Sequence, residues 1–386
     1  MQAVKKGLII ITLLMAISTV NAQLIKIGLY TKSNVKNVIF TVNKGKYQIF
    51  ADSMHVIPIF GKKIINFTLK GNLIEVKTLN KKLGEFRNIE IQGIGDENTF
   101  KVQCLIPKYR ERLYDDDLIL RVRNNRIQII NHVDLEKYIA GVVESEGGSK
   151  SSLEYYKTQA IITRTYALRN FYRHISEGYN LCSSVHCQAY HHKATKSDKI
   201  LKAVKMTRGL VIVDTTLNLI NAAFHSNSGG QTSSSEMIWL TPKSYLKSVI
   251  DTFSTKRSNA VWTKTIPLWK WKSYLKKNGF TIPANVKPED FNFEQKQRKM
   301  FYVFNNDSML LKDIRTDFKL RSTFFSVKAD AKQVVLHGRG YGHGVGLSQQ
   351  GAMEMAMENY NYREIIKFYY KNVFIVSLRA LNFFKE

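Results

Sequence analysis

Cysteine is scarce in this sequence of 386 residues, which contains only Cys104, Cys182 and Cys187. Three cysteines are too few for a small protein held together by disulfides. Disorder is also excluded, because 44% of the residues are hydrophobic and 11% are aromatic. A chain of this length is expected to form two or three compact units.

Long apolar runs are also lacking, which excludes a membrane-spanning helix of about 20 residues. The run from Gly7 to Ile17 is shorter, follows Lys5 and Lys6, and precedes the small residues of Val20-Asn21-Ala22. This pattern predicts a secretory signal peptide over residues 1–22. No cysteine follows the expected cleavage site, which argues against a lipoprotein. We therefore expect a secreted protein of the periplasm or cell-wall space.

Acidic residues are few. The sequence has 31 Asp and Glu but 58 Lys and Arg, which gives a formal net charge of +27. Such a balance attracts polyanions. The basic residues are scattered in short pairs, and no zinc finger, basic zipper or RNA-binding signature accompanies them. Nucleic acid is therefore not the expected partner. For an exported chain, an anionic polymer or surface of the cell envelope fits better, and a generally basic solvated surface is the alternative.

The pattern of apolar residues predicts an α+β fold with a β-rich N-terminal domain over residues 23–128. Asn124 and Asn125 are typical of a tight hairpin turn. A domain of mixed helices and strands is expected over residues 129–386, with an insertion at about 250–330 and a strand after it. Its long helix begins near Ser151, which with Glu154 resembles a capping box, and Asn361 with Glu364 repeats that pattern.

Two glycine-containing polar stretches lack known nucleotide or nucleophile signatures. "HGRGYGHGVGLSQQGA" (337–352) has no P-loop lysine and no dinucleotide spacing. Its glycines allow close approach to another surface, and its polar side chains suit sugars; a tight turn before a helix is the alternative. "AFHSNSGGQTSSS" (223–235) has no G-x-S-x-G elbow and is interpreted as a cleft wall.

A third stretch, "CSSVHCQAYHH" (182–192), concentrates thiols and imidazoles. Cys182, His186 and Cys187, with His174 upstream, could provide a tetrahedral zinc site. Their spacing matches no common zinc finger. A Cys182–Cys187 disulfide closing a short loop is the alternative in an oxidising compartment.

Four motifs in order resemble the stage II sporulation protein D / amidase enhancer LytB family. They are "YIAGVVESEGGSKSSLEYYKTQAIITRTYAL", the HCQAY stretch, "HSNSGGQT" and "GRGYGHGVGLSQQGA", spread over residues 138 to about 370. The β-rich N-terminal part resembles the family only loosely. The resemblance implies a secreted peptidoglycan-active protein, and its sporulation members are lytic transglycosylases that cleave glycan strands stripped of stem peptides.

The resemblance also implies the site residues. Glu146 takes the family's catalytic glutamate position, whereas Glu144 falls where the family varies. A carboxyl beside apolar residues has a raised pKa and can act as a general acid. Zinc, seen in some sporulation members, is implied at His174, Cys182 and Cys187, with His186 adjacent. Residues expected to bind the glycan are Arg164, Ser226, Asn227, Ser228, Gly229, Arg339, His343 and Gln349.

The sequence departs from the family at one point. Gly147-Gly148 follows Glu146, where members of the family often have Met-Pro, and this puts the rigidity of the loop in doubt. Two other functions remain open. One is a non-catalytic wall-binding protein that enhances an N-acetylmuramoyl-L-alanine amidase. The other is a zinc hydrolase, for which the sequence has no H-E-x-x-H motif.

Overall fold

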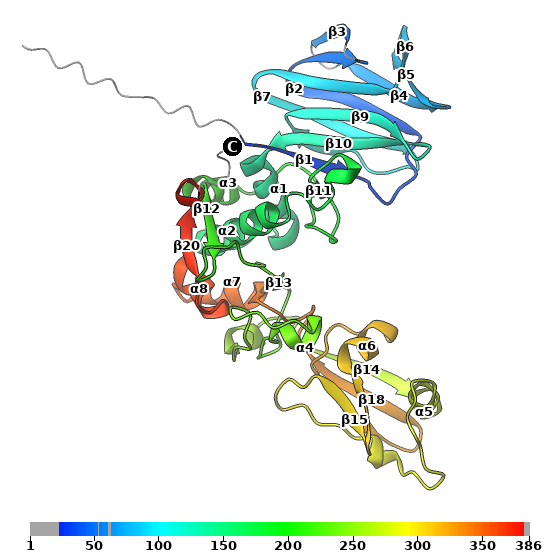
Figure 1. The fold of residues 1–386 in the computed structure, drawn as a ribbon, viewed down its shortest axis with the longest axis vertical. Coiled ribbons are helices and arrows are strands. Elements are labelled where there is room, and N and C mark those ends of the chain that lie inside the picture. The colour runs from blue at the N-terminus through cyan, green and yellow to red at the C-terminus, as the bar shows by residue number, and fades with distance from the viewer. Residues whose placement is uncertain (1–22, 53, 61–62, 382–386) are drawn as a thin grey trace, which may run out of the picture.

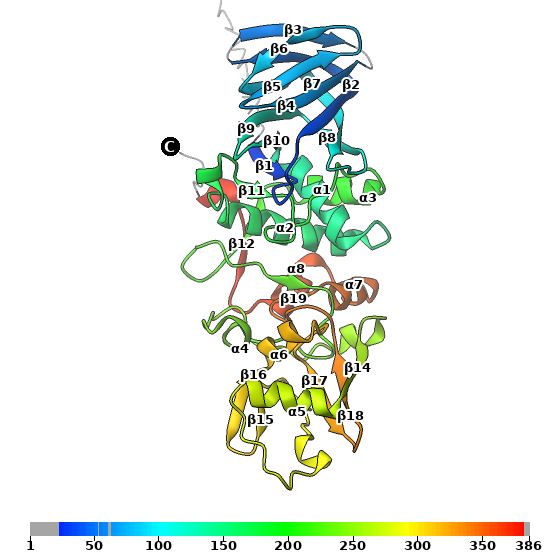
Figure 2. The same cartoon turned by 90° about the vertical axis from the view of Figure 1, so that its right-hand side faces the viewer.

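The fold is a mixture of helices and strands, which confirms the predicted α+β class. The computed structural model describes residues 23–381 except 53, 61 and 62, so the predicted signal peptide lies outside the described residues. A large sheet lies at one end of the long axis, helices occupy the middle, and a small subdomain lies at the other end (Figures 1 and 2).

The N-terminal part is an 11-stranded sheet with the order β11-β1-β10-β9-β7-β2-β4-β5-β6, in which β3 pairs with β2 and β8 with β7. Its strands are β1 (Leu24–Leu29), β2 (Asn37–Ala51), β3 (Met54–Phe60), β4 (Ile64–Lys70), β5 (Leu73–Thr78), β6 (Lys82–Phe86), β7 (Asn88–Ile106), β8 (Arg112–Asp115), β9 (Asp117–Arg123), β10 (Arg126–Asp134) and β11 (Leu181–Cys182). The sheet thus continues past residue 128 and takes a strand from much later in the chain.

Local sequence accounts for much of this sheet. The predicted hairpin is confirmed, since Asn124 and Asn125 join β9 to β10 with φ values of 50° and 53°. Alternate residues such as Val38, Phe40 and Val42 are buried, because successive side chains of a strand point to opposite faces. One continuous hydrophobic core joins this sheet to the helices below it.

The middle layer contains α1 (Leu135–Gly147), α2 (Leu153–Arg169), α3 (Asp198–Met206), α7 (Gln349–Met357) and α8 (Tyr362–Tyr369). Helix α1 follows β10 directly, and Asp134 caps it by accepting the N–H groups of residues 136 and 137. The N-cap of α2 is Ser152 rather than the predicted Ser151. The predicted capping box of Asn361 and Glu364 is confirmed at α8.

Short elements connect these helices. They are the 3-10 turns at Ile175–Glu177, Thr252–Lys256, Pro288–Phe291 and Leu378–Leu381, helix α4 (Ser235–Trp239), and the strand pairs β12 (Leu210–Val213) with β20 (Phe374–Ser377) and β13 (Phe224–His225) with β19 (Leu347–Ser348).

The inserted subdomain has a hydrophobic core of its own, built from residues between Trp262 and Leu336. It comprises β14 (Val261–Pro267), α5 (Leu268–Lys277), β15 (Phe301–Phe304), β16 (Asp307–Leu310), α6 (Leu311–Asp317), β17 (Phe325–Ala329) and β18 (Gln333–Arg339). Strand β18, predicted to follow the insertion, is instead the central strand of the sheet β14-β18-β17.

Among the residues that the structure describes, no helix combines the length and apolarity that a bilayer crossing requires.

Candidate functional site

The end of helix α1 holds the segment of residues 189–196 through three consecutive side chains. The Glu146 carboxylate accepts a hydrogen bond from the Ala189 N–H at 2.8 Å. The Ser145 hydroxyl accepts the His191 N–H at 3.2 Å. The Glu144 carboxylate accepts the N–H groups of residues 195 and 196, the latter at 2.7 Å. This segment is therefore fixed to α1 along most of its length.

Glu144 and Glu146 have different environments. Glu144 is only 4% exposed, and its oxygens are occupied by backbone N–H groups. Glu146 is half-buried and has one such bond. Burial raises the pKa of Glu146, and the bond from Ala189 only partly offsets that rise. A carboxyl that is partly open to solvent and holds its proton more strongly than an ordinary glutamate is suited to donate that proton to a substrate.

The glycines after Glu146 end the helix and allow close packing. A Cβ on Gly147 would lie 2.9 Å from the Tyr155 hydroxyl, so a side chain there would displace this buried tyrosine. Gly148 has a φ of 69° and caps the helix. The Tyr156 hydroxyl donates to the Gly148 carbonyl at 3.0 Å and accepts the Ser151 N–H at 2.9 Å. The turn is thus held by tyrosines in place of a proline.

Arg164 does not line a cleft, so the prediction that it binds the glycan is wrong. Its side chain is fully buried, and its guanidinium donates two hydrogen bonds to the Glu136 carboxylate, from Nε at 2.9 Å and Nη2 at 2.5 Å. A third bond reaches the Leu210 carbonyl. Arg164 therefore connects α1, α2 and β12 in the interior, where a polymer has no access.

Arg164→Met is expected to destabilise the fold by about 3 kcal/mol, because it leaves the Glu136 carboxylate without its buried partner. Denaturant unfolding measures this loss. The double variant Arg164→Met/Glu136→Leu removes both charges and should recover part of it. If Arg164→Met alone kept native stability but bound glycan more weakly, Arg164 would be a glycan-binding residue after all.

The two glycine-containing stretches pack against each other. β13 pairs in parallel with β19, and Asn227 forms a β-bridge with Tyr341. A Cβ on Gly229 would lie 2.6 Å from the Arg339 carbonyl carbon, and one on Gly340 would lie 2.6 Å from the Asn227 oxygen. The close approach that the glycines predicted is therefore confirmed, and the surface approached is the other stretch of the same chain.

This packing buries most of the predicted cleft wall. Asn227 is 1% exposed and donates to the Ser254 carbonyl and to Gln350. Ser228 is fully buried and donates to Asp251 at 2.7 Å. Gly229 is also buried, so these three residues shape the fold and do not face a ligand. Ser226 is half-buried.

His343 has both ring nitrogens engaged. Its Nε2 donates to the Phe224 carbonyl at 2.9 Å, and its Nδ1 accepts the Val345 N–H at 3.1 Å. Burial lowers the pKa of His343 to about 4, so the ring is neutral at ordinary pH. Its ring packs 5.5 Å from that of Trp239, measured between centroids. His343 is therefore a structural residue with no nitrogen left for a sugar.

The last two predicted glycan-binding residues, Gln349 and Arg339, lie in different parts of the structure. Gln349, the first residue of α7, donates from Nε2 to the Glu146 carbonyl at 3.3 Å and so belongs to the surroundings of the acid. Arg339 ends β18 in the inserted subdomain. Its guanidinium lies over the Phe324 ring at 3.6 Å.

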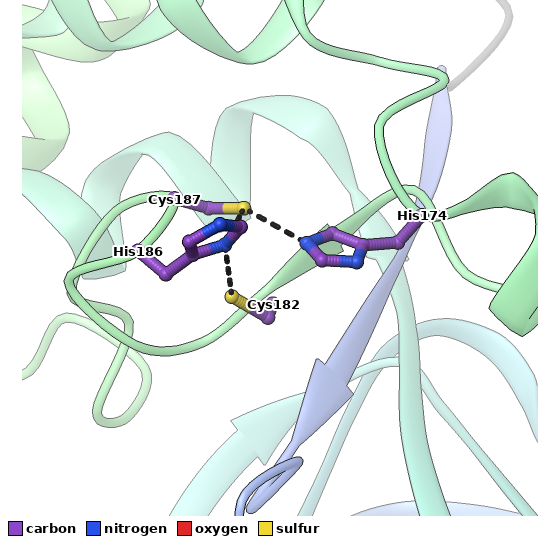
Figure 3. A group of neighbouring side chains, drawn as sticks. All are labelled: His174, Cys182, His186 and Cys187. Atoms are coloured by element: carbon purple, nitrogen blue, oxygen red, sulfur yellow. Dashed lines mark hydrogen bonds between the residues drawn. The ribbon is translucent and has the colours of Figure 1, made fainter.

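The predicted metal ligands come together (Figure 3). The ligand atoms of His174, Cys182, His186 and Cys187 all lie within 4.8 Å of one another. The Cys187 sulfur is 3.4 Å from His174 Nε2, and both sulfurs are 3.7 Å from His186 Nδ1. Ligands of a tetrahedral zinc ion are separated by roughly 3.4–3.8 Å, so the cluster fits a metal of this kind.

Cys182 and Cys187 are free thiols in this structure and are therefore available as ligands. A neighbouring carboxylate also favours a metal. The Glu177 carboxylate lies 2.6 Å from His174 Nδ1 and accepts a bond from the Tyr179 hydroxyl. A carboxylate on the far nitrogen of a ligating histidine is a common feature of zinc sites. Sequence reasoning missed Glu177, although its position three residues after His174 was a usable signal.

Comparison with known proteins places these features in a family. The model of the family described as "Stage II sporulation protein" matches residues 123–213, a range that holds Glu146 and all four candidate ligands. Stage II sporulation protein D of Bacillus subtilis (strain 168) is 30% identical over 290 residues, covering 71% of this chain and 83% of that protein.

Two other relatives agree. Stage II sporulation protein D of Bacillus amyloliquefaciens is 28% identical, covering 66% of this chain and 77% of that protein. A Bacillus subtilis (strain 168) protein named "Amidase enhancer" is 29% identical, covering 62% of this chain but 40% of its own length. The chain therefore belongs to the stage II sporulation protein D family, whose relatives suggest a role at the cell wall.

Proposed function

We propose that this protein is an exported lytic transglycosylase that cleaves peptidoglycan glycan strands, with Glu146 as its single acid and base. The observation that carries this proposal is the contrast between the two glutamates of α1. Glu144 is occupied by backbone N–H groups, whereas Glu146 is partly open and has a raised pKa.

One carboxyl suffices for this reaction, although ordinary glycosidases use two. The protonated Glu146 donates its proton to the glycosidic oxygen as the bond to the muramic acid C1 breaks. The muramic acid 6-hydroxyl then bonds to C1 and gives its proton back to the Glu146 carboxylate. The products are a shorter strand and a 1,6-anhydro-muramic acid end, and no water is consumed. The Ala189 N–H stabilises the carboxylate between these two steps.

We place zinc at His174, Cys182 and Cys187, with His186 as the fourth ligand. When bound, the ion would cross-link the 174–187 loop. That loop leads directly into the segment 189–196, because Ala189 is two residues after Cys187. The cluster would thereby support the N–H group that contacts Glu146.

The second candidate function is enhancement of a cell-wall amidase without catalysis. It is favoured by the relative named "Amidase enhancer". It is also favoured by the burial of Arg164 and Ser228 and by the hydrogen bonds at both ring nitrogens of His343, which leave fewer groups for a glycan than the sequence predicted. The net charge of +27 suits binding to an anionic wall in either case.

Mass spectrometry of purified glycan strands, with and without stem peptides, separates the two functions. Incubation with the protein alone should release fragments with 1,6-anhydro ends from stripped strands. If such fragments never form, but addition of the protein speeds peptide release by an N-acetylmuramoyl-L-alanine amidase, the enhancer function holds instead.

A further inference from the structure

The inserted subdomain carries a polar hollow of about 430 Å³ on the outer face of its three-stranded sheet. Its lining is Val261, Trp262, Thr263, Glu294, Gln295, Lys296, Ser326, His337, Gly338 and Arg339. None of these residues comes from α1 or from the segment 189–196. Strands β14 and β18 lie toward the end of the molecule opposite the N-terminal sheet (Figures 1 and 2). The hollow is therefore separate from the Glu146 site.

The floor of the hollow is a row of polar side chains across the sheet. Thr263 on β14 and Ser326 on β17 both pair in register with His337 on β18. Side chains at paired positions lie on the same face. Thr263 and His337 are exposed, and the Ser326 oxygen accepts the Gln295 N–H at 3.1 Å, which leaves its hydroxyl proton available.

Arg339 forms one wall and is held in position before any ligand binds. Its guanidinium stacks on the Phe324 ring at 3.6 Å, and its Nη2 donates to the carbonyls of residues 295 and 296. Within the part of the chain that the structure describes, Nε and Nη1 have no acceptor, and no carboxylate forms an ion pair with Arg339. A fixed guanidinium with two unused donors is suited to a planar carboxylate.

The charge of the surroundings agrees with an anionic ligand. Residues 261–339 contain 16 Lys and Arg against seven Asp and Glu. The hydroxyls of Thr263 and Ser326 add neutral donors of the kind that sugars require. Glu294 also lines the hollow and would repel a dianion more strongly than a single carboxylate, which favours a carboxylate over a phosphate monoester.

We infer that this hollow is a second glycan-binding site, which takes a sugar bearing a free carboxylate, and we identify that sugar as muramic acid with an unsubstituted lactyl group. The inference rests on the proposed function for the choice of polymer. Arg339 holds the carboxylate, and the row of residues 263, 337 and 326 contacts the sugar. The site would keep the protein on stripped strands between cleavage events.

The test measures binding by calorimetry with full-length Glu146→Gln protein, which cannot turn over the probe. The probe is the GlcNAc–MurNAc disaccharide with a free lactyl carboxylate, compared with its methyl ester. The free acid should bind roughly tenfold tighter or more. His337→Glu places a negative charge in the hollow and should lower that affinity by a similar factor, whereas the exposed Ser273→Glu on α5 makes the same change in net charge and should not.

Arg339→Lys keeps the positive charge but loses the planar guanidinium that can donate two parallel hydrogen bonds. It should therefore weaken binding of the free acid more than binding of the ester. Equal affinity for acid and ester, or no effect of His337→Glu, overturns the inference, as does tighter binding of an anionic phosphate polymer than of the disaccharide. Failure of the proposed function is seen separately, as the absence of anhydro products with wild-type protein. That result does not depend on how the disaccharide binds.

Discussion

Glu146→Gln is expected to reduce release of 1,6-anhydro products by roughly 10²–10⁴-fold while leaving the fold intact. Glutamine keeps the shape of the side chain and can still accept the Ala189 N–H, but it has no proton to donate. The rate of product formation from stripped strands, followed by mass spectrometry, measures the loss. Full activity in this variant would end the transglycosylase proposal.

Glu144→Gln is the matched control, since it makes the same chemical change two residues away. Its carboxylate accepts the N–H groups of residues 195 and 196, so we expect a loss of about 1–3 kcal/mol in stability. Product formation per folded molecule should change far less than in Glu146→Gln. Equal losses of activity from both substitutions at a temperature where both fold would mean that the roles of the pair are misassigned.

Removal of the metal is expected to have the largest effect on stability. A tightly bound ion contributes roughly 3–4 kcal/mol through its preference for the folded state, and loss of that contribution lowers the Tm of a chain of this size by roughly 5 °C. Protein purified without added zinc should contain about one equivalent of metal. Thermal melts with and without a chelator measure the change.

Cys182→Ala should lose both the metal and the response to chelator, whereas Cys104→Ala, in the core of the N-terminal sheet, should keep both. Because Ala189 follows the cluster closely, metal-free protein should also lose activity. A protein mass that shows a Cys182–Cys187 disulfide, together with no bound metal, would contradict the zinc proposal.

The features predictable from sequence are those with local causes. Asn124 and Asn125 form a hairpin because asparagine tolerates positive φ, and Asn361 caps α8 through groups within three residues. The clustering of the four metal ligands was also predictable, because they lie within 14 residues of one another.

The features that sequence could not give depend on distant partners. Arg164 was expected among the glycan-binding residues, and nothing in the local sequence shows that Glu136, 28 residues earlier, pairs with it in the interior. The glycines near residue 340 predicted a close approach but not its target, which lies about 110 residues upstream at 227–229. The hollow beside Arg339 arises from three strands and has no sequence signature.

The pairing of β1 with β11 has a consequence for the order of folding. Gly28 lies beside Cys182 in this parallel pair, although about 150 residues separate them in the chain. A chain made from its N-terminus exposes β1 long before β11 exists, and contacts of such sequence separation form slowly. Strand β1 can pair with β10 earlier, but its other edge stays open until β11 is made. The two thiols therefore reach their positions late, and any delay in closing this edge would delay the candidate metal site and the Glu146 site together.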